Sequence, residues 1–430
     1  MSARKSFLLF LLLSCGMLLH AAPVTEVKAE YPLKNRKPGE NVSFSVKAME
    51  NGSLVKDGVL EIEIQENGLC VKKLKLDLAS ENPKVIAATM QKPGFLTCRT
   101  WVYESPEKKE TYVYGRDTVP FEPEKLQPAA AAPADFDAFW AKAFKSALDT
   151  PPDFRLTPLE KASTKTHKAY LLSFALDGGV RMYGFLSVPA DAGQKKYPAV
   201  LRIPGAGPGF TAVRHQPGVM TLQMNIHFID PSDNASFRNE YAKLDSPRPY
   251  QTRNIAEPER YYLSRVVPGL CRAADFLAEH PAWNGKSLIA AGSSQGGALS
   301  LMTAAFQGKI TAVSASIPAL CDQNGRLAGR APGWPNLHGA MQRFEKQLSE
   351  ADRTRICGYF DTVHFVPKIK VPVNMNCGAM DIVCPPHTVY IAYNLIRAPK
   401  EIMIMPAASH SVSPDGSRKN DEFMKKEFAK

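Results

Sequence analysis

The segment Gly292-Ser293-Ser294-Gln295-Gly296 constrains the fold of this chain more than any other. A run of β-forming residues, 287–291, leads into it, and a run of helix-forming residues, 298–306, leads out. A strand that turns directly into a helix leaves space only for small residues beside the central one. The pattern therefore predicts a nucleophile elbow that presents the hydroxyl of Ser294 at the edge of a sheet. An ordinary glycine-rich turn is the alternative.

Composition indicates a globular protein without a nucleic-acid partner. The 430 residues, 44% hydrophobic and 22% charged, are enough for two or three domains with large cores. The formal net charge of +11 raises nucleic acid or an acidic polymer as partners. The basic residues are scattered, and runs such as residues 107–110 mix both signs, so a solvated surface is the better interpretation. Weak attraction to an acidic polysaccharide stays open.

The N-terminus, residues 1–22, has the pattern of a secretory signal peptide. Arg4 and Lys5 precede an apolar run, residues 7–19, and small residues follow it. The pattern predicts a secreted or periplasmic protein. Lipoprotein anchoring at Cys15 is the weaker alternative because the apolar run continues past that residue. The run is too short for a membrane span, and no later segment is long and apolar enough for one.

The cysteines indicate neither a metal site nor a disulfide framework. There are eight, and loss of the signal peptide removes Cys15, so an odd number remains and at least one thiol stays free. Their spacings match no metal pattern, and we expect most of them to pack as small apolar residues. Cys377 and Cys384 are close enough in sequence to pair.

Residues 23–126 are expected to form a β-sandwich domain of immunoglobulin-like type. Apolar and polar residues alternate over residues 42–46 and 60–64, and turn-forming pairs such as Asn51-Gly52 separate the strands. Further strands are predicted at residues 73–78, 97–103 and 111–114. A Pro/Ala-rich linker, residues 127–134, then marks a domain boundary.

Residues 135–430 are expected to form an α/β domain, because early strands are followed by repeated strand–helix units that imply a mostly parallel sheet. Its first helix has Asp135 as its cap and buries an aromatic stripe, Phe136, Phe139, Trp140 and Phe144. Strands are predicted at residues 169–174, 181–188, 199–203, 222–229, 287–291, 313–317, 371–375 and 401–405. Helices are predicted at residues 262–280, 295–306, 338–348, 386–395 and at the C-terminus. An irregular segment, residues 325–334, is a candidate insertion over the face that carries Ser294.

Asp381 and His410 are the candidate partners of Ser294. A serine hydroxyl is a poor nucleophile until a base removes its proton. In α/β-hydrolases the acid and then the histidine follow the serine, on loops after the last strands. Asp381 follows the strand predicted at residues 371–375, and His410 follows the one at 401–405.

Other interpretations of these residues are weaker. His364 precedes the acid, which is the wrong chain order, and His387 opens a helix and is expected to be exposed. Asp381 could instead cap that helix, but Pro385 and Pro386 stand at its start.

The oxyanion that forms during acyl transfer needs two preorganised N–H groups. One is expected from the main chain of Gln295, directly after the serine and near a helix N-terminus. The other is assigned to the main chain of Ala206, in the glycine-rich loop after the strand at residues 199–203. A flexible glycine turn is the alternative for that loop. Such chemistry requires no metal and no organic cofactor.

Several motifs resemble the acetyl xylan esterase / cephalosporin C deacetylase family of carbohydrate esterases. The segment 292–297 resembles the Gly-x-Ser-Gln-Gly-Gly elbow of that family, and residues 378–390 resemble its acid loop. Residues 360–372 match the approach to that loop, and Phe136-Asp137-Ala138-Phe139-Trp140 resembles the opening helix. The resemblance spans roughly residues 133–430.

This resemblance implies an α/β-hydrolase fold, removal of acetyl groups from saccharides such as xylan or xylo-oligosaccharides, and a homo-oligomer. The chain departs from the family at Pro204-Gly205-Ala206, where members usually have His-Gly-Tyr. The departure keeps the main-chain donor but loses a tyrosine side chain, which puts the substrate preference in doubt. The N-terminal β-domain is additional to the minimal family member.

Two other functional classes compete with a saccharide deacetylase. A serine peptidase of the α/β-hydrolase class has the same order of catalytic residues, but the N-terminal region of about 100 residues is too small for the propeller that such enzymes often carry. A secreted carbohydrate-binding protein with a vestigial triad is the non-catalytic alternative, and the complete set of candidate residues argues against it.

Overall fold

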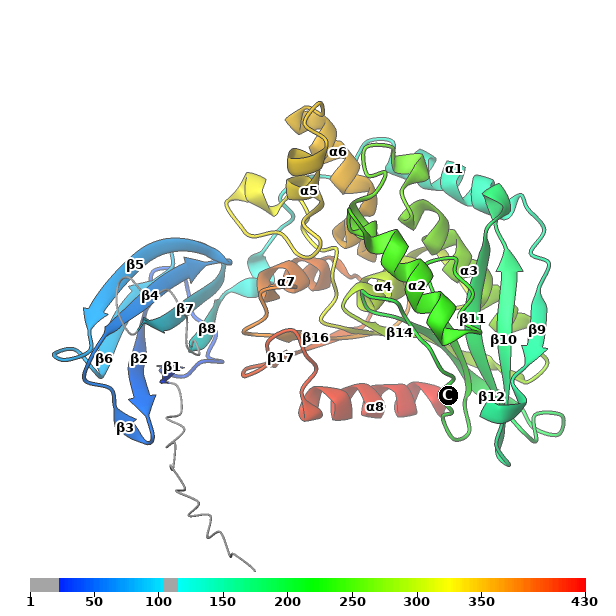
Figure 1. Ribbon diagram of the computed structural model, residues 1–430, viewed down its shortest axis with the longest axis horizontal. Coiled ribbons are helices and arrows are strands. Elements are labelled where there is room, and N and C mark those ends of the chain that lie inside the picture. The colour runs from blue at the N-terminus through cyan, green and yellow to red at the C-terminus, as the bar shows by residue number, and fades with distance from the viewer. Residues whose placement is uncertain (1–22, 104–114) are drawn as a thin grey trace, which may run out of the picture.

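The computed structural model describes residues 23–103 and 115–430 (Figure 1). The predicted signal peptide and the strand predicted at residues 111–114 lie outside the described residues. Within the two described ranges, no helix has the length and apolar character that a bilayer span requires.

The first eight strands form two four-stranded antiparallel sheets. One sheet contains β1 (Val24–Ala29), β2 (Asn41–Glu50), β3 (Ser53–Leu54) and β6 (Lys84–Thr89). The other contains β4 (Val59–Glu66), β5 (Leu69–Asp77), β7 (Gly94–Tyr103) and β8 (Arg116–Phe121). Alternate residues of both sheets, such as Phe44 and Ile62, are buried in one shared core, as the period of two in the sequence predicts.

A nine-stranded sheet forms the centre of the remaining chain, with the strand order β17-β16-β15-β14-β12-β13-β11-β10-β9. Its strands are β9 (Arg155–Pro158), β10 (His167–Ala175), β11 (Arg181–Pro189), β12 (Tyr197–Ile203), β13 (Met220–Met224), β14 (Trp283–Ser293), β15 (Ala312–Ser316), β16 (Val373–Gly378) and β17 (Lys400–Met405). The strands from β12 to β17 pair in parallel, whereas β9, β10 and β11 pair antiparallel. The mostly parallel sheet that the sequence predicts is therefore confirmed.

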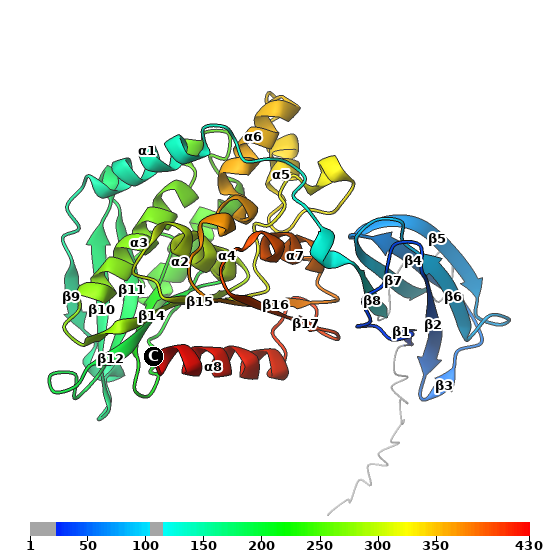
Figure 2. The ribbon, with the colours of Figure 1, turned by 180° about the vertical axis from the view of Figure 1, so that it is seen from behind.

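Helices cover both faces of this sheet. On one face lie α1 (Phe136–Leu148), α3 (Leu263–Glu279), α4 (Gln295–Phe306) and α7 (Pro386–Leu395), and on the other lies α8 (Pro414–Phe428) (Figures 1 and 2). Three more helices lie in connections between strands: α2 (Asn234–Asp245), α5 (Leu337–Phe344) and α6 (Glu350–Phe360). The aromatic stripe of α1 packs into the main core as predicted.

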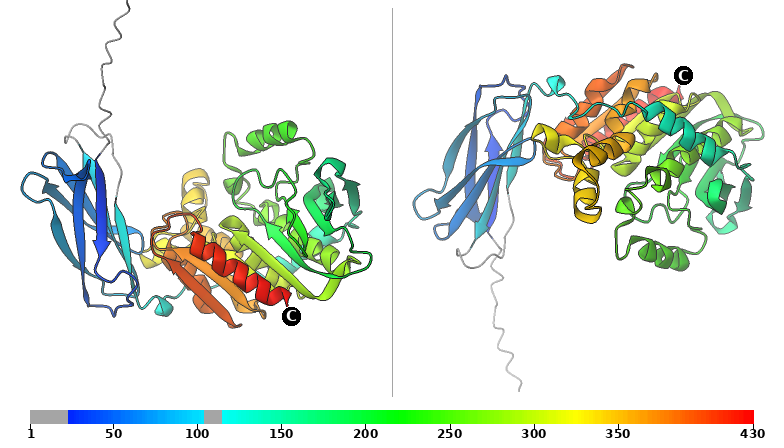
Figure 3. Two further views of the ribbon diagram at one scale, coloured as in Figure 1. Left: turned by 90° about the horizontal axis from the view of Figure 1, so that it is seen from below. Right: turned by 90° about the horizontal axis from the view of Figure 1, so that it is seen from above.

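The N-terminal sheets pack against the α7 end of the large sheet (Figure 3). The ring of Phe95 in β7 lies 5.5 Å from the ring of Tyr390 in α7, centroid to centroid. The side-chain amide of Asn394 donates to the carbonyl oxygens of Pro123 and Leu126 at 2.9 and 3.0 Å. These contacts join β7 and the segment after β8 to the helix that follows the Asp381 loop.

Several local predictions are wrong. Strand β13 ends at Met224 rather than at residue 229, because Asn225 turns away to bond the main chain of Phe210 with both ends of its amide. Helix α5 ends at Phe344 rather than at residue 348. Asp135 occupies the N-cap position of α1, but its carboxylate accepts the hydroxyl of Tyr359 instead of a main-chain N–H.

Cys377 and Cys384, which are close enough in sequence to pair, form no disulfide, and every cysteine in the described ranges is a free thiol. All of these thiols except that of Cys70 are buried, as expected for small apolar residues.

Candidate active site

The backbone at Ser294 has the strained geometry of a nucleophile elbow. Its φ of 57° and ψ of −121° lie outside the usual regions for an L-residue, between the end of β14 and the start of α4. A Cβ on Gly292 would lie 2.4 Å from the carbonyl oxygen of Gly296, and one on Gly296 would lie 2.2 Å from the carbonyl oxygen of Ile203. Glycine is therefore required at both positions for the turn to pack against the end of β12.

Hydrogen bonds join the three predicted residues in series. The Oγ of Ser294 lies 2.9 Å from Nε2 of His410, and Nδ1 of His410 lies 2.8 Å from Oδ2 of Asp381. With Nδ1 protonated toward the carboxylate, Nε2 has a lone pair that accepts the serine hydroxyl. The arrangement can therefore withdraw a proton from Ser294.

The carboxylate of Asp381 is fixed from two sides. The residue is only 3% exposed, and Oδ1 accepts the main-chain N–H groups of Val383 and Cys384 at 2.8 and 2.9 Å. These bonds leave Oδ2 directed at the imidazole of His410. These bonds do not favour a helix cap, because α7 begins at Pro386, after both of these donors.

The loops after β16 and β17 approach closely, and this brings the acid to the histidine. A Cβ on Gly378 would lie 2.4 Å from the carbonyl oxygen of Ser409, so only glycine permits this approach. The main-chain N–H of Met380 also donates to the carbonyl oxygen of Ala408 at 3.0 Å. Two segments 29 residues apart in sequence thus form one rigid corner.

An open cavity of about 350 Å³ lies over Ser294 and His410. It is lined by Gly205, Ala206, Ser293, Ser294, Ile317, Trp334, Val383, His410, Ser411 and Val412. The main-chain N–H of Trp334 donates to the carbonyl oxygen of Val383 at 2.8 Å, which holds the backbone of Trp334 beside the acid loop. The end of the irregular segment 325–334 therefore lies over this face, as predicted.

Of the two predicted oxyanion donors, Ala206 lies at this cavity and Gln295 directly follows Ser294. Ala206 is exposed in the loop after β12 and lines the cavity. Gln295 is the first residue of α4, and its side chain is fully buried away from the cavity lining. Its Oε1 accepts the hydroxyl groups of Tyr250 and Tyr262 at 2.8 and 3.0 Å.

A histidine connects the Ala206 loop to this tyrosine cluster. Nε2 of His227 lies 2.7 Å from the carbonyl oxygen of Gly207, and its ring packs edge-on against Tyr250 with centroids 4.6 Å apart. Because a carbonyl oxygen only accepts, the Nε2–H of His227 is the donor to Gly207. Burial lowers the pKa of His227, which favours the neutral ring. His227, Tyr250 and Tyr262 were not predicted from the sequence, because no motif distinguishes them from core aromatics.

The same corner contains a thiol. One potential ligand atom each from Asp381, Cys384 and His410 lie within 4.8 Å of one another. Burial raises the pKa of the Cys384 thiol well above its usual range, and the carboxylate and imidazole already bond to each other. The protonated thiol is a poor metal ligand, so these three atoms do not form a favourable metal site. The hydrogen bond between Asp381 and His410 explains why they lie close together.

The two rival histidines have structural surroundings. The prediction that His387 is exposed is wrong: it is 1% exposed, and its Nε2 lies 2.7 Å from the carbonyl oxygen of Ala331. Burial lowers the pKa of His387 to about 4. The ring of His364 packs edge-on against Phe136, with centroids 6.2 Å apart, and burial lowers its pKa to about 4 as well.

Comparisons with known proteins identify the family. The acetyl xylan esterase family model matches residues 121–427. The acetyl esterase Axe7A of Xylanibacter ruminicola is 35% identical over 360 residues, which cover 82% of this chain and 79% of that protein.

Two solved structures share the fold. Acetyl xylan esterase 1 from Thermoanaerobacterium sp. JW/SL YS485 has a TM-score of 0.61 at 20% identity, covering 71% of this chain and 98% of that one. Acetyl xylan esterase from Paenibacillus sp. R4 has a TM-score of 0.59 at 21% identity, again covering 71% and 98%. The chain therefore belongs to the acetyl xylan esterase family and is a carboxylic ester hydrolase with an α/β-hydrolase fold.

Proposed function

We propose that this protein is a serine esterase that removes acetyl groups from acetylated saccharides, such as xylan or xylo-oligosaccharides, through an acetyl-serine intermediate. The observation that carries the proposal is the hydrogen-bonded series from Ser294 through His410 to Asp381, beneath an open cavity. Membership of the acetyl xylan esterase family supports the acetyl group and the saccharide.

In the proposed acylation step, Nε2 of His410 takes the proton of the Ser294 hydroxyl while Oγ attacks the acetyl carbonyl carbon. Asp381 stabilises the imidazolium that forms and holds the tautomer in which Nε2 is the base. The tetrahedral intermediate then collapses, the bond from the carbonyl carbon to the sugar oxygen breaks, and His410 returns its proton to that oxygen. The deacetylated sugar leaves, and the acetyl group stays on Ser294.

Deacylation repeats these roles with water as the nucleophile. His410 removes a proton from a water molecule, the resulting hydroxide attacks the acetyl carbon, and the proton returns to Oγ of Ser294. The products are acetate and free enzyme. Every proton transfer uses groups of the chain and the water, so the cycle needs no cofactor.

We assign stabilisation of the oxyanion in both steps to the main-chain N–H groups of Gln295 and Ala206. Loss of one such donor typically costs about 3 kcal/mol of transition-state stabilisation. The bonds from Tyr250 and Tyr262 to Gln295, and that from His227 to Gly207, support the assignment because they fix the segments that carry the two donors.

The wider organisation is part of the same proposal. We infer an immunoglobulin-like β-sandwich at residues 23–126, a linker at 127–134 and a catalytic domain at 135–430. A cleaved signal peptide, residues 1–22, would make the protein secreted or periplasmic. Homo-oligomerisation is expected from the family resemblance, and measurement of the mass in solution tests it.

Acetate release from acetylated xylo-oligosaccharides, with the Ser294→Ala variant beside the wild type, tests the function. We expect release by the wild type and a loss of at least about 10³-fold in the variant. Serine-dependent cleavage of 4-nitrophenyl acetate without release from saccharides would contradict the proposed substrate but keep the esterase chemistry. Faster cleavage of aminoacyl or prolyl amides would favour the peptidase alternative, and binding without any turnover would favour the carbohydrate-binding one.

A further inference from the structure

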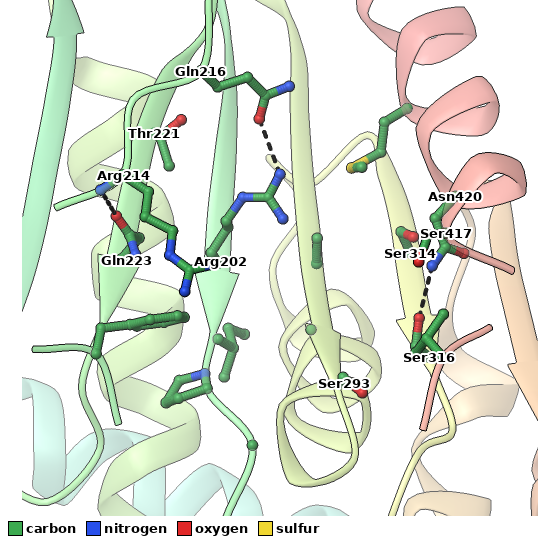
Figure 4. Close-up of a pocket in the computed structure, with 18 of the residues that line it drawn as sticks. Arg202, Arg214, Gln216, Thr221, Gln223, Ser293, Ser314, Ser316, Ser417 and Asn420 are labelled. Carbon is green, nitrogen blue, oxygen red and sulfur yellow. Dashed lines mark hydrogen bonds between the residues drawn. The ribbon is translucent and has the colours of Figure 1, made fainter. Parts of the chain in front are cut away.

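One face of the large sheet lacks a covering helix beside the candidate active site. Strands β12 and β13 are parallel neighbours, and the described connection between them, residues 204–219, contains no helix. Such crossovers usually carry a helix that covers the sheet. Here a groove of about 920 Å³ lies between this connection and α8 (Figure 4).

The sheet residues that line the groove form a polar band. Across the sheet, Gln223 of β13 lies opposite Arg202 of β12, and Ala291 of β14 lies opposite Ser314 of β15. Arg202 and Ala291 are also opposite each other, so the four residues form one row. Figure 4 shows Thr221, Gln223, Arg202, Ser314 and Ser316 along this face.

The earlier halves of the same strands differ. Val200, Ile289 and Ala312 are buried against Phe423 and Met424 of α8. The change from apolar to polar side chains therefore coincides with the point where the groove opens. A polar band on the face of a parallel sheet indicates a polar occupant, because unpartnered polar groups at such positions are costly.

Two of these polar groups have unused bonding capacity. Thr221 is 1% exposed and Gln223 is fully buried, and neither Oγ1 of Thr221 nor Nε2 of Gln223 has a partner within the described part of the chain. Oε1 of Gln223 accepts the main-chain N–H of Arg214 at 2.5 Å, which orients its amide nitrogen as a free donor.

The charges in the groove favour an anion. Three basic side chains, Arg202, Arg214 and Lys425, line it together with one carboxylate, that of Asp421. Within the described ranges Asp421 and the other carboxylates form no ion pair with either guanidinium. Among the described residues, the partner of Nη2 of Arg202 is the neutral Oε1 of Gln216, at 2.9 Å. Burial lowers the pKa of Arg202, and Arg214 lowers it further while Asp421 opposes the shift. A bound anion would relieve this unfavourable environment.

The groove adjoins the cavity over Ser294. Gly205, Ala206, Ser293 and Val412 line both spaces. Arg202 is two residues and one strand away from Ser293, which places their Cα atoms roughly 8 Å apart at standard strand spacings. A saccharide that presents an ester to Ser294 can therefore extend one of its sugars toward the arginines.

We propose that the groove is a subsite for a sugar carboxylate, the uronate group of an acidic residue attached to the acetylated saccharide. Arg202 and Arg214 bind the carboxylate, since a guanidinium matches its two oxygens in a planar, paired geometry. Thr221 and Gln223 offer hydrogen bonds to neighbouring hydroxyls. The inference rests on the proposed deacetylation of saccharides and adds to it a preference for acidic ones.

Kinetics on paired substrates test the subsite. The substrates are two acetylated xylo-oligosaccharides of equal length, one with a uronate branch and one without, assayed by acetate release. In Arg202→Met and in Arg214→Met we expect kcat/KM for the acidic substrate to fall about 10- to 100-fold, mainly through KM. The fall for the neutral substrate should be at least tenfold smaller. Arg214 is exposed, so we expect its replacement to leave folding intact. Arg214→Met therefore still tests the subsite if Arg202→Met impairs folding.

Arg397→Met is the matched control, because Arg397 is exposed and does not line the groove. It should leave kcat/KM for both substrates unchanged. An equal loss on acidic and neutral substrates in the groove variants would overturn the subsite, and so would no loss on the acidic one.

Direct binding separates this inference from the proposed function. The binding measurement uses Ser294→Ala, because this variant should not deacetylate the oligosaccharides. The uronate-bearing oligosaccharide should bind to it at least about tenfold more tightly than the neutral one, and added salt should reduce the difference. Arginine-dependent binding of free glucuronate or acetate, without any preference between the oligosaccharides, would overturn the subsite in favour of a small-anion site. If the wild type releases no acetate from either oligosaccharide, the proposed function is refuted. The binding preference would still show whether the groove is a uronate subsite.

Discussion

Arg116 donates a hydrogen bond from Nη1 to the carbonyl oxygen of Met380, the residue directly before Asp381. Arg116 lies in β8 and is 7% exposed, so a buried cation from an N-terminal sheet contacts the loop that carries the candidate acid. The main-chain N–H of Ala331 also donates to the carbonyl oxygen of Asn67 at 3.0 Å in this contact. The N-terminal sheets are thus placed to position the Asp381 loop.

Replacement of Arg116 by Met should therefore lower kcat for 4-nitrophenyl acetate by about tenfold, because small displacements of a catalytic group have large effects on rate. KM for this small ester should change little. Arg116→Lys, which keeps a cationic donor, should recover part of kcat. Arg418→Met, at an exposed arginine of α8, is the control and should match the wild type. Equal kcat in Arg116→Met and the wild type would show that the contact has no positioning role.

Gly296→Ala should destabilise the fold by about 3 kcal/mol, since its Cβ would lie 2.2 Å from the carbonyl oxygen of Ile203 and overpacking of this kind is costly. Gly308→Ala is the matched control, because a Cβ there meets nothing within 4 Å. Urea unfolding of both variants measures the difference. Similar midpoints for the two would mean that the elbow does not pack against β12 as described.

The tyrosine pair that bonds Gln295 should act cooperatively. Tyr250→Phe or Tyr262→Phe alone leaves Oε1 of Gln295 with one donor, whereas the double variant leaves a buried acceptor with neither. We expect the double variant to lose about 1–3 kcal/mol of stability beyond the sum of the single ones. A double-mutant cycle in kcat and in unfolding free energy measures the coupling. Strict additivity in both would refute a shared role for the two hydroxyls.

His387 should make stability depend on pH. Its pKa is lowered from 6.5 to about 4 by burial, with a smaller contribution from Arg330, so above pH 6.5 the ring is neutral in both the folded and unfolded states. As the pH falls from 6.5 to 4, the unfolded chain takes up a proton that the folded one does not. The native state should therefore lose up to about 3 kcal/mol from this group across that window.

The measurement for His387 is a difference, because other groups titrate in the same range. The free energy of unfolding of wild type and His387→Gln is compared at pH 7 and pH 4.5. The wild type should lose more stability on acidification than the variant does. Parallel pH profiles for the two proteins would contradict the buried neutral state of His387.

The elements around the site could be predicted from sequence because their local patterns are strong. Helix α4 was predicted at residues 295–306 and is observed at Gln295–Phe306. Chain order, together with placement on loops after the last strands, predicted that Asp381 and His410 would approach Ser294, and hydrogen bonds join the three. Their catalytic roles stay a prediction until they are measured.

The remaining features depend on distant contacts that no local pattern records. Helix α2 was missed because Phe237 is its one buried residue, so it lacks an apolar stripe. His387 was expected at the surface, but the contact with the N-terminal sheets buries it beside Gly68. Tyr250 and Tyr262 meet Gln295 only through folding of segments that are 45 and 33 residues away in sequence.

Covalent labelling tests the central claim, that Ser294 is the nucleophile. The purified protein is treated with a fluorophosphonate, and the adduct is counted by intact mass and located by peptide mapping. We expect one adduct per chain, on Ser294, formed in parallel with loss of acetyl ester hydrolysis and absent in Ser294→Ala. Inactivation with the adduct on another residue, or ester hydrolysis that persists in Ser294→Ala at the wild-type rate, would contradict the account.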